Sequence, residues 1–270
     1  MAQPILDIHA HIYPSKIAHK AVETIGRFYD APISHSGESD DLLASGAKIG
    51  VGRYVVHSTA TRVDQVRSIN DFLIAECRAH PEFIGFGTLH KDFPDLRGEL
   101  ERMRAEGLKG IKLHPDFQRF EADDPGVFPL YALAQEFRVP VLIHAGDRRF
   151  DFSGPLRLSR VLDAFPRLIL IAAHFGGYTE WDRTMDHLVG REVFFDTSST
   201  LWKLDPASAR AIIDRHGVDR MLFGSDYPMW DHAEELERLE TLKLSSGERE
   251  AILWGNGARL LSLPEPVALN

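Results

Sequence analysis

The sequence contains one cysteine, Cys77, in 270 residues. A single thiol excludes an intrachain disulfide, and Cys77 falls in a helical pattern, where we expect a small buried side chain. Residues 1–4 lead directly into the first predicted strand, so we expect no signal peptide. Both features favour a cytoplasmic location.

The sequence also lacks a basic cluster and a long hydrophobic run. Lys and Arg together number 31 against 40 Asp and Glu, and the formal net charge is −9. This balance argues against nucleic acid and anionic membrane surfaces as partners. No apolar run approaches the roughly 20 residues of a spanning helix. We therefore expect a small-molecule substrate, no nucleic acid and no membrane.

Short apolar runs alternate with amphipathic helical patterns along the chain. Buried parallel strands have this continuous apolar character, and alternation with helices predicts βαβ units. Eight such runs predict an α/β fold, the single-domain (β/α)8 TIM barrel, over residues 1–263, with a loose tail over 264–270. The alternative, an open doubly wound sheet, usually carries a Gly-rich turn after its first strand, and here His-x-His stands there. The predicted strands are residues 5–11, 53–57, 84–89, 109–114, 141–144, 168–174, 193–196 and 220–226.

Helical spacing and capping residues predict the helices between these strands. Residues 29–40 contain Pro, Gly and several Ser and predict a loop, which is a candidate cover for a site. The predicted helices include residues 15–28, 64–79, 127–138, 155–165, 206–216, 231–243 and 248–262.

Histidines gather at one end of the predicted strands. Active sites of (β/α)8 barrels lie at the carboxyl ends of the strands, so this distribution is the strongest functional signal in the sequence. The eighth strand ends in Asp226. Seven of the 13 histidines lie at or just after a predicted strand end, namely His9, His11, His57, His90, His114, His144 and His174. The other six, which include His216 and His232, fall on predicted helices or loops, and we expect them at the surface. Asp116, after the fourth strand, is a secondary site candidate.

Two of these histidines, His9 and His11, lie two residues apart on the first strand and therefore share a face. Imidazoles combined with a carboxylate suit a divalent ion such as zinc. We predict His9, His11, His144 and Asp226 as metal ligands, and we expect Zn²⁺, with Mn²⁺ as the alternative. His174 is predicted as a general acid or base, with a fifth-ligand role as its rival.

Six segments along the chain carry a family pattern, namely Asp7–Pro14, Gly110–Pro115, Ile143–Gly146, Ala173–Gly177, Phe223–Pro228 and Gly255–Leu261. They resemble the amidohydrolase superfamily, in the branch that includes aminocarboxymuconate semialdehyde decarboxylase and γ-resorcylate decarboxylase. The resemblance covers nearly the whole chain and implies a metal-dependent (β/α)8 enzyme. The resemblance assigns the four predicted ligands to one metal and gives His174 a part in activating bound water. Family members are often dimers, so a homodimer is the expected assembly if the chain associates.

Lys112, on the fourth predicted strand, has two candidate roles. Some binuclear relatives carry a carboxylated lysine there that bridges two metals, whereas a plain lysine would anchor a substrate carboxylate or pair with an acid. One metal per chain, without the bridge, is the preferred interpretation. His114, Arg148, Arg149 and Tyr227 are the remaining substrate-binding candidates, although the two arginines suit a surface loop and Tyr227 suits packing equally well.

These residues predict a metal-dependent hydrolase that directs an activated water at a lactone, amide or ester of a small anionic compound, with His174 or Asp226 accepting the proton. Non-oxidative decarboxylation of an aromatic or unsaturated carboxylic acid is the alternative, because the same ligands would serve it. A non-catalytic metal- or ligand-binding barrel is the rival from another class, and it would not need His174.

Overall fold

The computed structural model describes residues 4–264, so the predicted tail lies almost entirely outside the described residues. The chain divides into two compact units. Unit 1 contains both chain ends, up to Val56 and from Thr197, and unit 2 is His57–Asp196. The strands are β1 (Ile5–His11), β2 (Val51–His57), β3 (Phe83–Thr88), β4 (Gly110–Leu113), β5 (Val141–Ile143), β6 (Leu170–Ala172), β7 (Phe194–Asp196) and β8 (Met221–Leu222).

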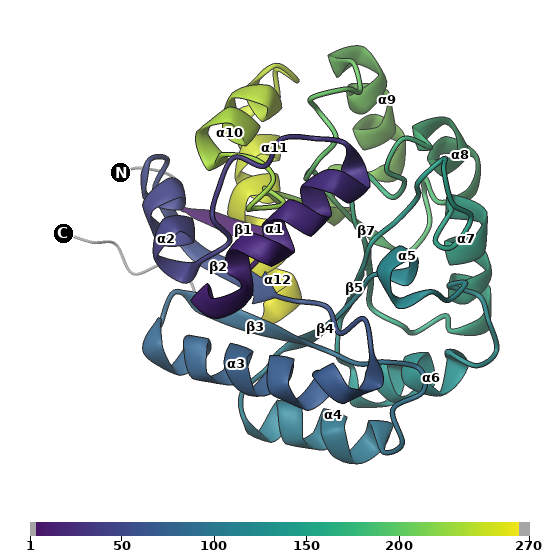
Figure 1. The fold of residues 1–270 in the computed structure, drawn as a ribbon. Coiled ribbons are helices and arrows are strands. Elements are labelled where there is room, and N and C mark those ends of the chain that lie inside the picture. Colours follow the sequence, from purple (N-terminus) through teal and green to yellow (C-terminus); the bar gives the residue numbers. More distant parts are fainter. Residues whose placement is uncertain (1–3, 265–270) are drawn as a thin grey trace. The chain divides into compact units, whose positions relative to one another are not determined.

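These strands belong to one sheet whose order follows the chain from β1 to β8, and helices separate successive strands. This topology is that of a (β/α)8 barrel, and the predicted fold class is confirmed. The helices are α1 (Ser15–Tyr29), α2 (Ser39–Ala47), α3 (Val66–Ala79), α4 (Leu96–Ala105), α5 (Pro115–Gln118), α6 (Phe128–Phe137), α7 (Pro155–Ala164), α8 (Trp181–His187), α9 (Pro206–His216), α10 (His232–Glu240), α11 (Ser246–Glu250) and α12 (Asn256–Leu261) (Figure 1).

Unit 2 contains the parallel strands β3 to β7. Lys112 of β4 pairs with Thr88 of β3 and with Leu142 of β5, which sets the register of the central strands. Ile111 and Ile143 are fully buried, as continuous apolar strands covered by helices require. Helix α3 lies along β3 (Figure 1). Since parallel strands run in one direction, the residues that follow β3 to β6 leave the sheet at the same edge.

Unit 1 contains β1, most of β2, and β8. Strand β1 pairs with the segment that follows β8: the amide nitrogen of Ile8 donates to the carbonyl of Phe223 at 2.9 Å, and that of His11 donates to the carbonyl of Tyr227 at 2.7 Å. The amide of Asp226 in turn donates to the carbonyl of His9 at 2.8 Å. These backbone bonds place the eighth-strand carboxylate beside the two first-strand histidines.

Several sequence-based interpretations need correction. His216 and His232, interpreted as surface residues, are both buried, and Cys77 is only half-buried. The last predicted helix is three segments, since α11 and α12 flank a π-helical turn over Ala251–Gly255. Shorter 3-10 turns cover Val63–Gln65 and Val218–Arg220.

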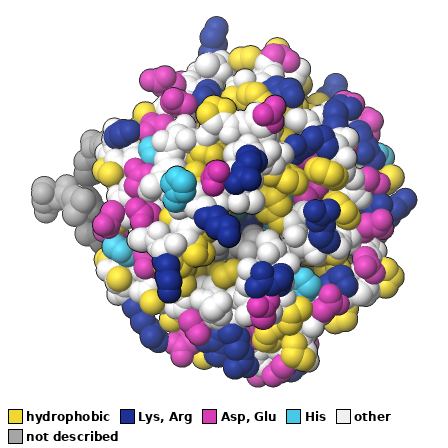
Figure 2. All heavy atoms as spheres, in the orientation of Figure 1, with side chains coloured by type: hydrophobic (Ala, Val, Ile, Leu, Met, Phe, Trp, Pro, Cys, Tyr) yellow, Lys and Arg dark blue, Asp and Glu magenta, His cyan; other side chains and the backbone are white. Residues whose placement is uncertain are grey.

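Charged side chains of both signs are interspersed on the face that Figure 2 shows. No helix within residues 4–264 is both long and apolar enough to cross a bilayer.

Candidate functional site

Three of the predicted ligands converge in unit 1. The Nε2 atoms of His9 and His11 lie 3.3 Å apart, and each lies 3.4 Å from Oδ1 of Asp226. His9 is fully buried, whereas the His11 and Asp226 side chains are 12% and 15% exposed. The group therefore has a protected side and a side that solvent reaches.

The spacing of these atoms fits a divalent ion. Ligand atoms that each lie about 2.1 Å from an ion at tetrahedral angles are separated by about 3.4 Å. Two imidazole nitrogens and one carboxylate oxygen form a donor set that zinc and related ions accept. The geometry of His9, His11 and Asp226 is thus suited to part of a divalent-metal site.

Two serines that the sequence analysis overlooked hold this group in place. Ser198 Oγ lies 3.1 Å from Nδ1 of His9, and Ser199 Oγ donates to Oδ2 of Asp226. Each serine engages the side-chain atom of its partner that does not face the other two candidate ligands, as outer partners of metal ligands commonly do. The available signal was the polar run over residues 197–200 directly after β7.

A buried carboxylate, Asp7, supports the backbone of the group. It accepts hydrogen bonds from the amides of His9 at 2.9 Å and Ser225 at 3.0 Å, and from the Ser225 hydroxyl at 2.6 Å. Its Oδ2 also lies 3.0 Å from Nε2 of the fully buried His232. These contacts tie β1 to the segment after β8 and to the first turn of α10.

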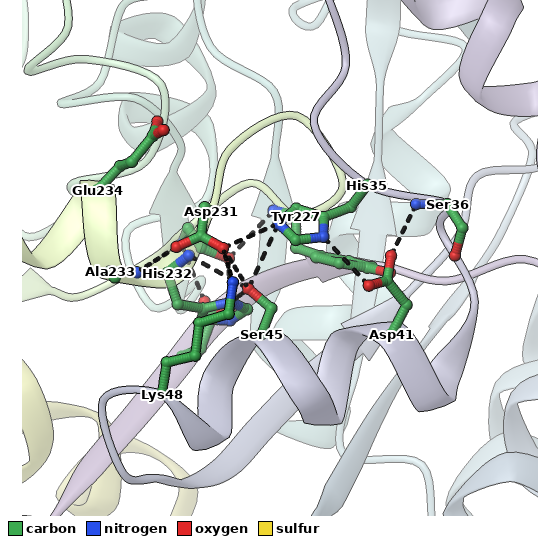
Figure 3. A network of polar contacts seen from close by, with 12 residues as sticks. His35, Ser36, Asp41, Ser45, Lys48, Tyr227, Asp231, His232, Ala233 and Glu234 are labelled. Carbon is green, nitrogen blue, oxygen red and sulfur yellow. Dashed lines mark hydrogen bonds and ion pairs between the residues drawn. The ribbon is translucent and has the colours of Figure 1, made fainter.

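Polar contacts continue from His232 to the loop over residues 30–38 (Figure 3). Ser45 Oγ lies 2.8 Å from Nδ1 of His232 and donates to Asp231 at 3.3 Å. His35 stands between two carboxylates, with Nδ1 3.2 Å from Asp41 and Nε2 3.2 Å from Asp231. The network secures the predicted loop against α2 and the start of α10.

Two further candidates, His144 and His174, meet in unit 2. Nδ1 of His144 lies 3.0 Å from Nε2 of His174, and both rings are almost fully buried. His174 adopts a left-handed backbone conformation with φ of 60°, and its amide donates to Oδ1 of Asp196 at 3.0 Å. The roles of His144 as ligand and His174 as acid or base remain predictions.

Asp116 joins His114 and His144 in a second cluster of potential ligand atoms in unit 2. Its Oδ2 lies 3.8 Å from Nδ1 of His114 and 3.7 Å from Nε2 of His144. Burial, reinforced by the charge of Asp147, raises the pKa of Asp116 to about 7. The His114 ring stacks on that of His144 at 4.1 Å between centroids. Asp116 was only a secondary candidate in the sequence.

The other predicted substrate-binding residues have varied surroundings. Lys112 is fully buried on β4. Arg148 is exposed and pairs with Asp182, and Arg149 pairs with Asp147 at 2.6 Å. Tyr227 is buried, with its hydroxyl 3.0 Å from both the carbonyl of Glu38 and Oδ2 of Asp41. Their substrate contacts stay predictions.

Comparisons with known proteins extend this picture. The chain is 26% identical over 259 residues to γ-resorcylate decarboxylase of Polaromonas sp. (strain JS666 / ATCC BAA-500), covering 76% of this chain and 78% of the relative. It is 22% identical over 296 aligned residues to 2-amino-3-carboxymuconate-6-semialdehyde decarboxylase of Caenorhabditis elegans, covering 76% and 73%. A shorter match, 40% identical over 63 residues and covering 21% of each chain, is to L-fucono-1,5-lactonase of Burkholderia multivorans (strain ATCC 17616 / 249).

Solved structures with the same fold include decarboxylases. A 2,6-dihydroxybenzoate decarboxylase in complex with 2,6-dihydroxybenzoate matches with a TM-score of 0.77 at 18% identity, covering 97% of this chain and all of that one. A dihydroxybenzoic acid decarboxylase from Polaromonas sp. JS666, with bound manganese and an inhibitor, matches with a TM-score of 0.75 at 17% identity, covering 97% of both chains.

The family model described as amidohydrolase matches residues 6–263. This match spans both compact units, and it includes the two histidines of β1 and Asp226 after β8. The predicted resemblance is therefore confirmed, and the chain belongs to the amidohydrolase family.

Proposed function

We propose that this protein is a metal-dependent decarboxylase that removes CO₂ from an aromatic or unsaturated carboxylic acid without an oxidant. The observation that carries the proposal is the convergence of His9, His11 and Asp226 at 3.3–3.4 Å, in a chain whose relatives over three quarters of its length are decarboxylases. This reverses the order of the two activities predicted from sequence, where hydrolysis came first.

A divalent ion bound by these side chains would supply a Lewis acid that orients oxygen atoms of the substrate. His9 and His11 would hold the ion from the rigid end of β1, with Ser198 fixing the tautomer and ring orientation of His9. We also propose His144 as a ligand, on the resemblance. Zn²⁺ and Mn²⁺ both suit this donor set.

Decarboxylation replaces the carboxyl group on carbon by a proton, so the site needs a proton donor. Asp226 and His174 are the proposed donors, and each takes up a proton from solvent after turnover. Ser199 donates to Oδ2 of Asp226, which limits rotation of the carboxyl group and fixes its position in the site. Lys112 and His114 are proposed to bind polar groups of the substrate.

The decisive experiment follows turnover of aromatic carboxylic acids, beginning with 2,6-dihydroxybenzoate, by protein purified without chelator or histidine tag. In D₂O, a decarboxylase releases CO₂ and places one deuterium on the carbon that carried the carboxyl group. Asp226→Asn should bind metal more weakly and lose activity, since an amide oxygen is a poorer ligand than a carboxylate. Asp219→Asn, which changes an exposed carboxylate, is the matched control. Turnover without deuterium in the product would contradict the proposal.

Lactone hydrolysis is the second candidate, and the 63-residue match to a lactonase favours it. Here the ion would supply a Lewis acid that lowers the pKa of water, and His174 or Asp226 would accept the proton of the water that adds to the lactone carbonyl. Turnover of sugar lactones in H₂¹⁸O would place one ¹⁸O atom in the product carboxylate and release no CO₂. Inactivity on both panels with metal bound would instead support a non-catalytic binding barrel.

A further inference from the structure

Two tryptophans of unit 1 lie next to each other beside the candidate metal group. The ring centroids of Trp202 and Trp230 are 5.6 Å apart, with the ring planes inclined by 32°. Trp202 follows β7 in a turn, and Trp230 follows β8. Trp202 is 41% exposed and is one of three large apolar side chains that the structure exposes within residues 4–264. An exposed indole held against a second indole forms a larger apolar surface than a single exposed side chain, and such surfaces are candidates for binding sites.

Hydrogen bonds fix both indoles to one residue, Ser199. Nε1 of Trp230 donates to Ser199 Oγ at 2.9 Å, and Nε1 of Trp202 donates to the Ser199 carbonyl at 3.0 Å. The same Ser199 hydroxyl donates to Oδ2 of Asp226. The aromatic pair is therefore separated from the candidate metal group by a single serine.

Cations border the pair. The Arg238 guanidinium carbon lies 4.6 Å from the centroid of the Trp230 ring, and Glu234 and Glu235 both pair with this arginine. Lys203 Nζ lies 5.5 Å from the centroid of the exposed Trp202 ring. The exposed part of the pair therefore combines the Trp202 indole with the positive charge of Lys203. That combination complements a planar ring that carries a carboxylate.

We propose that Trp202 and Trp230 form an aryl-binding wall that seats the ring of an aromatic carboxylate beside Asp226. The proposal rests on the decarboxylase function proposed above and names its substrate class, an aromatic rather than an aliphatic acid. Trp202 contacts the ring, and Trp230 and Ser199 are positioning residues that fix the wall relative to Asp226. Because hydrogen bonds hold both indoles in advance, little conformational entropy is lost on binding.

Benzoate and cyclohexanecarboxylate test the wall, because they share size and charge and differ in the planar ring. Dissociation constants are measured by titration calorimetry and by quenching of tryptophan fluorescence on the metal-loaded protein. We expect benzoate to bind about twofold to twelvefold more tightly than cyclohexanecarboxylate, which corresponds to the range measured for aromatic pairs. In Trp202→Leu this preference should fall to about one, since leucine keeps apolar surface and removes the ring.

Two variants separate the wall from a general effect on folding. Trp230→Phe keeps an aromatic ring but removes the Nε1 donor, so it should reduce the preference for benzoate in part. Ile17→Ala removes another exposed apolar side chain and should leave the preference for benzoate unchanged. A preference that is equal in wild type and Trp202→Leu would overturn the proposal. Loss of dimers in Trp202→Leu, with the preference for benzoate retained, would also overturn the proposal, because it would show that a second copy of the chain covers the indole.

These binding measurements need no turnover, so the two proposals fail separately. If benzoate binding depends on Trp202 but no acid is decarboxylated, the wall stands and the assigned reaction is wrong. If decarboxylation occurs and the preference for benzoate does not depend on Trp202, the proposed reaction is supported and the proposed aryl-binding wall is wrong.

Discussion

Ser199 and Asp226 both hold left-handed backbone conformations, with φ of 48° and 58°. Residues other than glycine rarely adopt this region, and the surrounding structure has to maintain it. The Ser199 hydroxyl donates to the Asp226 carboxylate, so the backbone conformations and the side-chain contact specify the same arrangement of these two residues. At the scale of single residues, the geometry of the candidate site depends on contacts such as that of Ser199 as well as on the candidate ligand atoms themselves.

Ser199→Ala should lower metal affinity or turnover by roughly 10-fold to 100-fold, the range found for outer partners of metal ligands. The alanine removes the donor to Asp226 and leaves the carboxylate free to rotate. Metal affinity from competition with a chromophoric chelator and kcat from CO₂ release check this. Ser246→Ala, at an exposed serine of α11, serves as control, and equal values for both variants would refute a positioning role for Ser199.

Asp116→Asn should change how stability depends on pH. The pKa of Asp116 is about 7 in the folded chain, above its value in the unfolded chain. Between about pH 4 and 7 the folded state therefore binds more protons at this carboxyl group than the unfolded state. Because of this difference, the contribution of Asp116 to the free energy of unfolding falls as pH rises through this window. Asparagine does not titrate. The free energy of unfolding of the variant relative to wild type should therefore rise from pH 4 to 7, by up to about 4 kcal/mol, and stay constant above it.

Urea unfolding of both proteins at pH 4, 5, 6, 7 and 8 measures this difference. The exposed carboxylate of Asp219 provides the comparison, because Asp219→Asn should show no such rise. A difference between Asp116→Asn and wild type that is constant across the series would contradict the raised pKa.

The gathering of His9, His11 and Asp226 could be predicted from sequence because these residues lie at or after the carboxyl end of a strand, and strand direction places such residues together. Ser198 and Ser199 could not, since serine is common in turns for local backbone reasons. His232 was misjudged because it opens a charged helix, and nothing in its neighbours indicates contact with Asp7 of β1. Contacts between distant segments are the information that local patterns omit.

At the scale of elements, the first turn of α10 is fixed by polar groups from three segments. His232 contacts Asp7 of β1 and Ser45 of α2, and Asp231 contacts Lys48 at 2.7 Å and His35 at 3.2 Å. The last predicted helix shows the same influence of neighbours. The carbonyl of Ile252 accepts from the amide of Phe223 within the π-helical turn, which a regular helical pattern does not predict.

His232→Phe should destabilise the protein by about 3–5 kcal/mol, because it leaves the buried Asp7 carboxylate without an imidazole partner. The free energy of unfolding from urea titration measures the loss. His19→Phe, on the exposed face of α1, controls for the added aromatic ring. A loss below about 1 kcal/mol, the usual value of a single hydrogen bond, would show that the other three donors satisfy Asp7.

At the scale of the whole molecule, the proposed metal links stability to ligand concentration. A metal at 100 times its dissociation constant adds about 2.7 kcal/mol, which in a chain of this length raises Tm by roughly 5–10 °C. Chelation should lower Tm by that amount, and added Zn²⁺ or Mn²⁺ should restore it. His11→Ala should remove the response, and a response retained in that variant would place the ion elsewhere.

The pairing of β1 with the segment after β8 also determines when, during synthesis of the chain, the candidate metal group can form. Asp7 and Ser225 are 218 positions apart in sequence yet hydrogen-bonded. While the ribosome is still translating the middle of the chain, His9 and His11 have emerged but Asp226 does not yet exist. The nascent protein cannot assemble the candidate metal group of His9, His11 and Asp226 until nearly all of the chain has been translated. A metal that binds all three of these side chains can accordingly be loaded only late in the maturation of this protein.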